Sequence, residues 1–337
     1  MVEASVIVCT RDRRGALLRL LESLVQSAAE AAPYEIEIIA VDDGSTDGTA
    51  EAAAQFAGTT QTPIHVVRQE GQGLSSGRNA GLRQAGGRLV AFVDDDCIVS
   101  PSYLRQMIGR FAADTEDVLR GGRVELGDPD DAPLTIKTSL AVERLAIGDR
   151  PGGFILGCNM AMTRGVLAAV GPFDERFGAG GFLRSAEDTD FVLRALLADV
   201  PVEYVPDMAV FHHHGRRRRA DVERIQRNYN VGDGALMLKH ARRAPWLFRN
   251  WYWSLRNALK ETVGGPLFDT RLGLSHAPVA FHHLVGAVLF ITAKIRRQPA
   301  WRGPVLAGNG GVDFAPLAAS GFSRFGVRRP TDGAAVS

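Results

Sequence analysis

The run Leu89-Val90-Ala91-Phe92-Val93-Asp94-Asp95-Asp96-Cys97 decides how this chain folds. Its apolar half is typical of a buried strand, and three carboxylates follow directly where that strand ends. Carboxylates at the end of a buried strand are costly unless a positive charge lies on them, and a divalent cation carrying a diphosphate satisfies that need. The run therefore predicts a metal and nucleotide site at one edge of a sheet.

The rest of the N-terminal half repeats this pattern of strands that end in polar residues. Residues 5–10 and 36–41 are rich in β-branched side chains, and residues 15–32 between them carry leucines at helical spacing. A short alanine-rich helix at about 50–56 leads to a further strand at 64–67. Strands that alternate with helices predict an α/β fold, with a Rossmann-like, mostly parallel sheet flanked by helices and ligands beyond the carboxyl ends of its strands. The polar residues at such ends are Thr10, Asp42, Asp43 and Asp94 to Asp96.

Six motifs along the chain point to one enzyme family. They are VDDGSTDGT at 41–49, GLSSGRNAGLRQAGG at 73–87, FVDDD at 92–96, GCNMAMTR at 157–164, VGPFDERF at 170–177 and AEDTDF at 186–191. Acidic strand ends alone also occur in nucleotidyltransferases and Rossmann enzymes, but the six together resemble a family 2 glycosyltransferase of GT-A fold, of the bacterial polysaccharide or glycolipid-assembly type. The resemblance covers roughly residues 4–215. It implies an inverting transfer of a sugar from a nucleotide-diphosphate sugar, a UDP-sugar above all, to a hydroxyl of a saccharide or lipid-linked acceptor.

The resemblance also implies where the donor binds. It places the nucleobase between Thr10 and Asp43, whose carboxylate would accept the N3 hydrogen of uracil or thymine. Arg78 would lie near the nucleotide, and Asp94 would contact the ribose or assist the metal. Two structural interpretations stay open, with Asp43 as an Asx-turn or helix cap and Arg78 as a salt bridge inside the domain. The donor-binding candidates are Thr10, Asp42, Asp43, Arg78, Asn79, Asp94 and Asp95.

A divalent cation, Mn²⁺ or Mg²⁺, is expected beside the donor diphosphate, because cleavage leaves charge on the diphosphate that a metal ion can neutralise. Asp96 is the expected ligand, and Asp94 would assist it. In related enzymes a downstream histidine completes the metal shell, which favours His212 and then His214. A surface loop is the alternative for these histidines.

The expected base for the acceptor hydroxyl is Asp188, because AEDTDF matches the family motif whose aspartate deprotonates the acceptor. Glu187 would orient the acceptor or the base, and Asp190 would cap the helix that follows. The dipole of that helix stabilises such anions, so a purely structural role for the acidic pair is the alternative. Gly157 and Asn159 match the segment near the donor sugar and acceptor, where Asn159 would bind a sugar hydroxyl or form a turn.

Charge divides the chain into two parts. Residues 1–208 hold 19 Lys and Arg against 31 Asp and Glu, whereas residues 209–337 hold 20 against 7. A basic segment after an acidic one indicates two electrostatic tasks. The expected organisation is a catalytic domain at 1–215 (nucleotide-binding part about 1–100, acceptor part about 101–215), a basic helical extension at 216–314 and a flexible tail at 315–337.

The basic extension suits an anionic membrane surface. Arg216 to Arg219, with the aromatic Trp251 and Trp253, predict short amphipathic helices on a bilayer where a lipid-linked acceptor resides. Pairing of these arginines with the acidic domain is the alternative. No DNA- or RNA-binding motif accompanies the charge, so nucleic acid is not an expected partner.

Cysteine usage and hydropathy bear on the location of the protein. Cys9, Cys97 and Cys158 lack CxxC spacing, so they predict neither a disulfide framework nor a zinc site and fit a reducing compartment. No signal peptide is recognisable before the first strand, and the apolar run 284–293 is about half of the roughly 20 residues that a membrane span needs. The expected location is the cytoplasm, with peripheral attachment to the inner face of the cell membrane.

Two other functions compete with glycosyl transfer. A nucleotidyltransferase would build a nucleotide sugar instead of consuming it, and a non-catalytic nucleotide-sugar or membrane-binding protein would have a decayed site. The acidic pair Glu187 and Asp188, placed to activate a hydroxyl, argues against the first. The presence of both Asp96 and Asp188 argues against the second.

Overall fold

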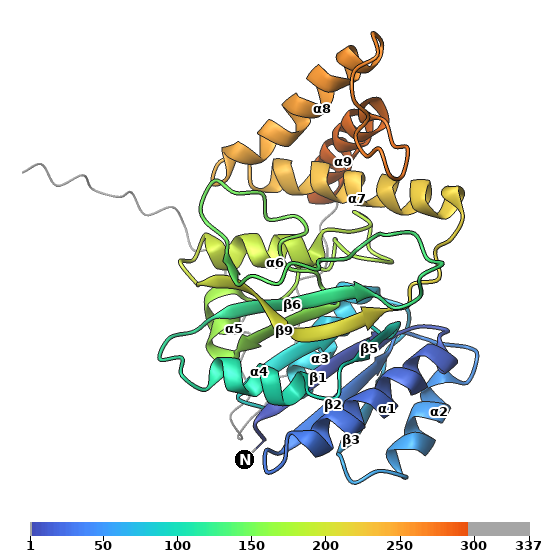
Figure 1. Cartoon of the computed structure of the whole chain (residues 1–337), viewed down its shortest axis with the longest axis vertical. Helices are drawn as coiled ribbons and strands as arrows, with labels where there is room; N and C mark the ends of the chain where they lie inside the picture. The colour runs from blue at the N-terminus through green and yellow to red at the C-terminus, as the bar shows by residue number, and fades with distance from the viewer. Residues whose placement is uncertain (1, 296–337) are drawn as a thin grey trace, which may run out of the picture.

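The computed structural model describes residues 2–295. Its strands form one nine-stranded sheet (Figure 1). The strand order is β3-β2-β1-β4-β8-β6-β9-β5, and β7 pairs with β9. The strands are β1 (Ala4–Thr10), β2 (Ile36–Asp42), β3 (Ile64–Arg68), β4 (Leu89–Val93), β5 (Cys97–Val99), β6 (Leu119–Leu126), β7 (Glu143–Arg144), β8 (Asn159–Thr163) and β9 (Val202–His212).

The strands expected from the N-terminal sequence form the parallel half of the sheet, since β3, β2, β1 and β4 are parallel neighbours. The other half is mixed, because β8 runs antiparallel to both β4 and β6. Parallel register sets Thr10 beside Asp42 at the carboxyl edge. The antiparallel pairing of β5 with β9 sets His212 opposite Cys97 at the same edge. The edge thus gathers residues that are far apart in the sequence.

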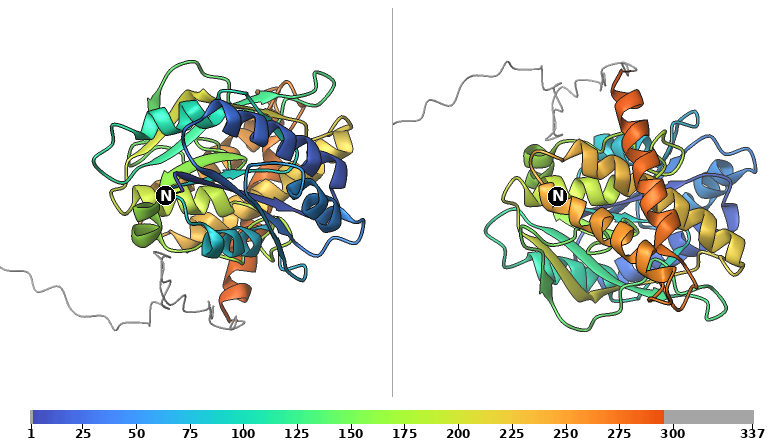
Figure 2. Two further views of the ribbon diagram at one scale, coloured as in Figure 1. Left: turned by 90° about the horizontal axis from the view of Figure 1, so that it is seen from below. Right: turned by 90° about the horizontal axis from the view of Figure 1, so that it is seen from above.

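Helices cover both faces of the sheet (Figure 2). Alternate residues of β1 face opposite sides, as the strand period requires: Val6 and Val8 join the core beneath α1 and α4, whereas Ile7 joins the core beneath α3, α5 and α6. These helices are α1 (Arg14–Glu30), α2 (Thr49–Ala57), α3 (Leu74–Gln84), α4 (Tyr103–Phe111), α5 (Arg164–Val170) and α6 (Glu187–Leu196).

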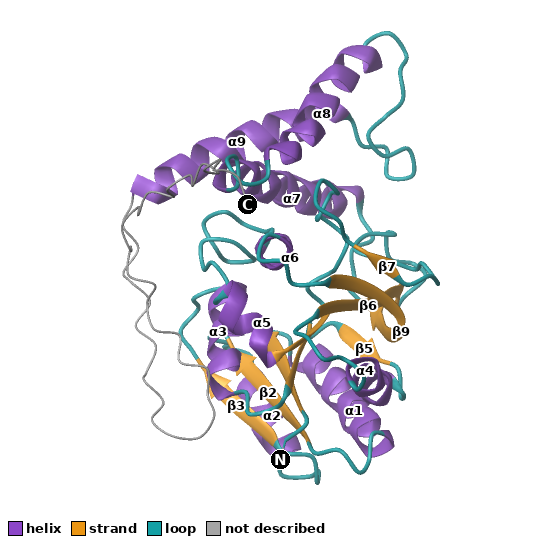
Figure 3. Cartoon of the chain, turned by 90° about the vertical axis from the view of Figure 1, so that its left-hand side faces the viewer, coloured by secondary structure: helices purple, strands orange, loops and turns teal. Residues whose placement is uncertain are grey.

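The C-terminal helices lie together beyond α6, at the end of the molecule away from the N-terminus (Figures 1 and 3). They are α7 (Arg219–Lys239), the 3₁₀ turn η1 (Pro245–Leu247), α8 (Phe248–Glu261) and α9 (His276–Ile295). The expected extension is therefore helical where it is described, but it shares a core with the catalytic part: Phe177 and Leu193 pack with Leu236 and Phe290.

Helix α9 crosses α7 closely. A side chain on Gly286 of α9 would overlap the carbonyl oxygen of Val231, and one on Gly234 of α7 would overlap that of His283. By length and composition α9 is also sufficient to cross a membrane over His276–Ala293, although 33% of that stretch is buried within the protein. The expected tail at 315–337 lies outside the described residues.

Candidate active site

Arg13 joins the acidic residues that follow β4. Its Nη1 lies 3.0 Å from Asp95 Oδ1 and 2.6 Å from Asp96 Oδ2. Thr10, at the end of β1, donates its hydroxyl hydrogen to the other Asp95 oxygen at 2.7 Å. Burial raises the pKa of Asp95 to about 6, although the positive charge of Arg13 opposes that rise. The carboxylates at this strand end thus need a cation, and here an arginine side chain supplies it.

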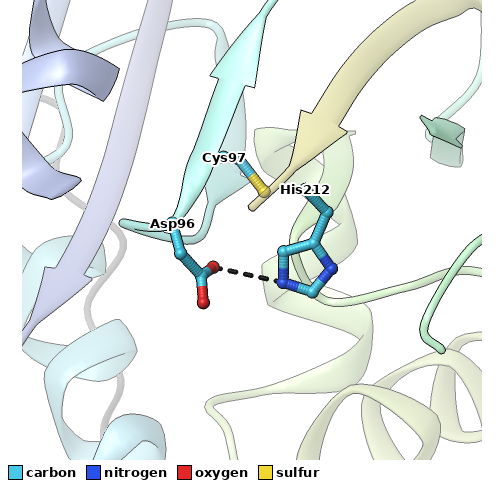
Figure 4. Close-up of side chains that lie close together, drawn as sticks. All are labelled: Asp96, Cys97 and His212. Carbon is cyan, nitrogen blue, oxygen red and sulfur yellow. Dashed lines mark ion pairs between the residues drawn. The ribbon is translucent and has the colours of Figure 1, made fainter. Parts of the chain in front are cut away.

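His212 faces Asp96 from the end of β9 (Figure 4). Its Nε2 lies 3.2 Å from Asp96 Oδ1. Burial lowers the pKa of His212, but the hydrogen bond to Asp96 and the surrounding negative charges together raise it to about 9. For Asp96 burial acts in the opposite direction and raises the pKa, but His212 and Arg13 hold this pKa below its usual range. The pair is thus a charged contact at the carboxyl edge of the sheet.

The side chains around Asp96 fit a divalent cation. The candidate ligand atoms of Asp96, Cys97 and His212 all lie within 4.8 Å of one another. A carboxylate oxygen with an imidazole nitrogen is a donor pair that suits Mn²⁺. Figure 4 shows the three side chains converging from the segment after β4 and from the end of β9. Asp96 and His212, both expected as ligands, are therefore brought together.

His214, the second histidine that was expected at the metal, has a structural role. Its Nε2 lies 3.1 Å from the carbonyl oxygen of Ala132, and its Nδ1 accepts the amide hydrogen of Arg216 at 3.0 Å. Both ring nitrogens are therefore occupied by backbone groups. The expectation that His214 reaches the metal is corrected on this geometry, because backbone groups hold both of its ring nitrogens.

Asp43 holds the segment before α3 and does not cap α2. Its Oδ1 accepts hydrogens from the side chain of Gln69 at 2.6 Å and the amide of Gln72 at 2.7 Å, and its Oδ2 accepts the amide hydrogen of Gly73 at 2.9 Å. Asp42 differs: it is 2% exposed, and its Oδ1 has no hydrogen-bond partner among the described residues. A buried carboxylate oxygen without a partner is an acceptor that a bound ligand can satisfy.

Arg78 ties the donor side to the acceptor side. The residue is 1% exposed. Its Nη1 donates to Glu187 Oε1 at 2.9 Å, and its Nη2 donates to Asp94 Oδ1 and to the carbonyl oxygen of Gly157, each at 3.2 Å. The salt-bridge interpretation therefore describes Arg78, which pairs with the partly exposed Asp94. Burial and the charge of Asp188 raise the pKa of Glu187 to about 7, although Arg78 opposes them.

Asp188 lies in the first turn of α6 and is partly exposed. Its Oδ2 accepts the amide hydrogen of Gly157 at 2.9 Å, and its Oδ1 accepts that of Thr189 at 2.6 Å. These bonds orient the carboxylate and leave lone pairs that can accept a proton. Burial raises the pKa of Tyr229 of α7 to about 12, and the charges of Asp188 and Glu187 add to that rise. The extension therefore borders the candidate base.

The two expected asparagines are used inside the fold. Asn79 donates to the carbonyl oxygen of Phe173 at 3.0 Å and accepts the amide hydrogen of the same residue at 2.9 Å. Asn159 donates to the carbonyl oxygen of Met208 at 2.7 Å and accepts the hydroxyl hydrogen of Tyr103 at 3.0 Å. Both side chains are almost fully buried. The expected contacts of Asn79 with the donor and of Asn159 with a sugar are corrected to cross-links within the protein.

Asp190 anchors the extension, where a helix cap was expected. Its Oδ2 accepts the Arg194 Nε hydrogen at 2.8 Å. Its Oδ1 lies 2.7 Å from Lys239 Nζ and 2.8 Å from His240 Nε2. Burial raises the pKa of Asp190, but these cations together hold it well below its usual range. Because Lys239 and His240 lie at the C-terminal end of α7, the ion cluster fixes that end of α7 to α6.

Some basic and aromatic residues of the extension turn inward. Arg217 Nε lies 3.1 Å from Asp131 Oδ1. The exposed Arg219 instead pairs along the surface of α7, where its Nε lies 2.7 Å from Glu223 Oε1. The indole hydrogen of Trp251 is donated to the carbonyl oxygen of Ala280 at 3.2 Å. The alternative left open from the sequence, pairing with the acidic domain, therefore describes Arg217. Trp251 packs on α9.

Sequence reasoning missed Arg13 and the meeting of Cys97 with Cys158. A signal for Arg13 exists, because the basic run 11–14 directly follows the end of β1, beside the strand that leads to the carboxylates. Cys97 and Cys158 lie buried in the same core cluster. No local signal marks this proximity, since it arises when β8 pairs antiparallel with β4.

A pocket opens beside Asp96. The N-terminus of α1 forms part of its wall, and the amides of a helix N-terminus with nearby arginines suit a phosphate group. The pocket is thus placed to hold an anionic ligand next to the metal-ligand set. Its lining residues are Asp12, Arg13, Arg14, Gly15, Ala16, Asp47, Asp96, His213 and His214.

Comparison with known proteins gives both a family match and relatives. Residues 5–171 match the family described as Glycosyl transferase family 2. Glycosyltransferase AglE of Haloferax volcanii is 24% identical over 244 residues, which cover 69% of this chain and 73% of AglE. Two further curated relatives match over 115 and 117 residues, and this chain spans only 32% and 31% of their lengths.

Two solved structures are similar in fold. The mannosyltransferase PcManGT from Pyrobaculum calidifontis, in complex with GDP-Man and Mn²⁺, has a TM-score of 0.52 and 18% identity, covering 87% of this chain and 73% of that one. TarS 1-349 of S. aureus in complex with UDP has a TM-score of 0.51 and 16% identity, covering 91% and 95%. At these identities the likeness concerns the fold alone, which is the expected GT-A arrangement.

Proposed function

Residues 5–171 of this chain belong to glycosyl transferase family 2, and from that premise we propose that the protein moves a sugar from a nucleotide-diphosphate sugar to an acceptor hydroxyl with inversion. The observation that carries the proposal is the position of Arg78. One buried guanidinium contacts Asp94 on the donor side and Glu187, next to the candidate base Asp188, on the acceptor side. The two halves of a transfer site are thereby held around one cation.

Asp188 is the proposed general base. Its carboxylate takes the proton of the acceptor hydroxyl while that oxygen forms a bond to the anomeric carbon and the bond from this carbon to the diphosphate oxygen breaks. Attack on the face opposite the leaving group inverts the configuration, and no covalent sugar–enzyme intermediate forms. The amide hydrogens of Gly157 and Thr189 fix the carboxylate for this task.

The proposed donor is a UDP-sugar held at the ends of β1, β2 and β4. The unpartnered Oδ1 of Asp42 offers an acceptor for a donor hydrogen, and Thr10, Asp43 and Asp94 lie at the same sheet edge. TarS, which is similar in fold, was solved with UDP. PcManGT was solved with GDP-Man, so GDP-sugars belong among the donors to be tested.

A divalent cation, Mn²⁺ or Mg²⁺, is the proposed cofactor. Asp96 and His212 would hold it, with Asp94 on the same loop. When bound, such a cation neutralises charge on the departing diphosphate. Arg13, which contacts Asp95 and Asp96, would then be free to turn toward the phosphates in the pocket that it lines.

A donor panel tests this proposal. The full chain is incubated with nucleotide sugars and Mn²⁺, and free nucleoside diphosphate is measured; we expect slow hydrolysis that Asp96→Ala abolishes. Loss of nucleotide sugar only in the presence of pyrophosphate would identify a nucleotidyltransferase. No turnover of any donor, with or without an acceptor, would leave a non-catalytic nucleotide-sugar or membrane-binding protein.

The proposed acceptor is a hydroxyl of a saccharide or of a lipid-linked saccharide. The protein would reach it while bound to the anionic inner face of the cell membrane. The support is the outer face of α8 and α9, where Leu259 is 75% and Phe281 is 62% exposed. The exposed basic residues Arg249, Arg256 and Lys260 of α8 accompany this apolar face. Basic side chains near an anionic bilayer contribute about 1 kcal/mol each.

Liposome co-sedimentation tests the membrane proposal. Binding should require anionic lipid and weaken as salt rises, and Leu259→Glu together with Phe281→Glu should reduce it strongly. Tyr34→Glu, at an exposed apolar residue of the catalytic part, is the matched control. Equal binding to neutral and anionic liposomes, or no binding to either, would remove the anionic membrane from the proposal.

A further inference from the structure

Three side chains of different chemistry meet beside the sheet edge, and one of them is a thiol. The candidate ligand atoms of Asp96, Cys97 and His212 lie within 4.8 Å of one another. All three residues are buried, and Cys97 is 1% exposed. Carboxylate and imidazole groups accept many divalent cations, whereas a thiolate selects soft or borderline ones such as Zn²⁺ and Cd²⁺.

We propose that Asp96, Cys97 and His212 form a site for a thiophilic divalent cation, of which Zn²⁺ is the natural example. The site shares Asp96 and His212 with the metal site of the proposed function, and it rests on that function only through these two residues. Cys97 Sγ is the new ligand, and its thiol proton leaves to solvent when the cation binds. A fourth position stays open to water or to a further ligand.

The geometry requires only a small contraction. Ligand atoms around tetrahedral zinc lie roughly 3.5 Å apart, given bond lengths of about 2.0–2.3 Å. The ligand atoms here lie up to 4.8 Å apart. Side-chain rotations that move these atoms by roughly 1 Å therefore bring them to the separation that zinc requires. The pairing of β5 with β9 already sets Cys97 opposite His212, so the backbone of these two ligands is fixed in advance.

A second cysteine, Cys158, lies buried in the same core cluster as Cys97. Both cysteines are free of disulfides, so the Cys97 thiol is available as a ligand.

The consequence for the enzyme is competition at Asp96. A cation held by Cys97 lies on the buried side of Asp96, whereas a cation that serves a diphosphate must face the pocket that Asp96 lines. The same carboxylate cannot take both positions. Zinc should therefore lower turnover in the presence of Mn²⁺, and it should do so through Cys97.

Cadmium titration of the reduced full chain tests the proposal. We expect one equivalent of Cd²⁺ to produce a thiolate-to-cadmium absorption band in the wild type. In Cys97→Ser the band should disappear, and Cd²⁺ affinity should fall by more than the roughly 10- to 100-fold that loss of an outer partner of a metal ligand costs. Cys9→Ser is the matched control and should keep the band. Far-ultraviolet circular dichroism verifies the fold of each variant.

Cadmium-113 NMR uses the wild-type chain, so its result does not depend on whether a variant folds. A thiolate ligand shifts the cadmium resonance strongly, and the resonance therefore reports whether Cys97 binds the ion. A resonance typical of oxygen and nitrogen ligands only, or a band that survives Cys97→Ser, overturns the inference. Normal Mn²⁺ and nucleotide binding beside that result would leave the proposed function standing. Cadmium bound through Cys97 in a protein that releases no diphosphate would support this site and refute the proposed function.

Discussion

At the scale of residues, Arg13 occupies the place where a metal ion is proposed to act. Its guanidinium contacts Asp95 and Asp96 together, so the metal-free protein avoids a bare cluster of carboxylates. A metal ion that binds Asp96 must displace one of these contacts. The arginine is therefore a competitor of the cation as well as a stabilising partner.

Replacing Arg13 should separate these two effects. In Arg13→Gln we expect Mn²⁺ affinity in the absence of nucleotide to rise by about 10-fold, while the metal-free protein loses about 1 kcal/mol of stability. Calorimetric titration with Mn²⁺ and thermal melting measure the two quantities. Arg19→Gln, an exposed change on α1, is the control. Unchanged Mn²⁺ affinity in Arg13→Gln would show that the arginine does not compete.

Asp188 gives the second prediction at this scale. Asp188→Asn should bind the donor almost normally but lose transfer by roughly 100-fold or more, because general-base assistance is removed. Steady-state kinetics with donor-binding measurements check it. Asp199→Asn is the matched control, since Asp199 is exposed just beyond α6 and its positive φ of 59° is one that asparagine tolerates. Weakened donor binding with an unchanged transfer rate would make Asp188 a structural residue.

Gly157 gives the third prediction at the scale of residues. An alanine Cβ there would lie 2.7 Å from Arg78 Nη2 and 3.1 Å from Asp188 Oδ2. We expect Gly157→Ala to lose about 1–3 kcal/mol of stability and much of its activity, because both partners must shift. Gly109→Ala, where a Cβ on α4 meets no atom within 4 Å, is the control and should be neutral or slightly stabilising. Melting and turnover of the two variants decide between strain at the site and a general effect of the added methyl.

At the scale of elements, α6 is held between the sheet and α7. Asp174, in the segment before α6, pairs with Arg176 and with Lys239 of α7 at 2.8 Å. Burial raises the pKa of Asp174, but the Arg176 hydrogen bond and the Lys239 charge lower it to about 2. Since the folded value lies below the ordinary 3.8, this contact stabilises the protein fully above about pH 4.

Acidification should therefore loosen the docking of α7. We expect the melting temperature to fall as the pH drops from about 4 to 2, and to fall less in Lys239→Met, which has already lost the cation. Melting curves at several pH values measure both slopes. Lys260→Met, on the exposed face of α8, is the control. Parallel slopes for wild type and Lys239→Met would show that Asp174 gains nothing from α7.

The elements also show what the sequence could predict. The strand ends at Thr10, Asp42 and Val93 were predictable, because apolar period and polar termination are local features of the chain. The roles of Asn159 and His214 were not. Their partners, the carbonyl oxygens of Met208 and Ala132, come from segments whose approach depends on the mixed half of the sheet. A motif shows which polar groups are present, whereas long-range packing decides which of them are already satisfied.

At the scale of the whole molecule, the charge boundary near residue 215 is not a boundary of the core. Phe177, Leu183 and Leu193 of the catalytic part pack with Leu236 and Phe290 of the extension. Tyr229 of α7 also lies close enough to feel the charge of Asp188. The described helices of the extension therefore complete the catalytic part.

Truncation tests this interpretation. A chain ended at residue 215 should lose the cover of each large apolar side chain in the shared core, at about 1.5–3 kcal/mol apiece, and leave Asp190 buried without Lys239. We expect a lower melting temperature, dye binding to exposed apolar surface and aggregation. Melting and light scattering, compared with the full chain, measure this. A monomeric truncated chain with the original melting temperature would show that the domain stands alone.

The buried position of Arg78 also determines when activity can arise during folding. Its guanidinium is satisfied only when the turn after β4, the turn at Gly157 and the start of α6 have all reached their places. An incompletely folded chain consequently lacks the assembled arrangement on which the proposed transfer depends. Turnover by a variant of this protein is, for the same reason, a sensitive report that these three segments have folded together.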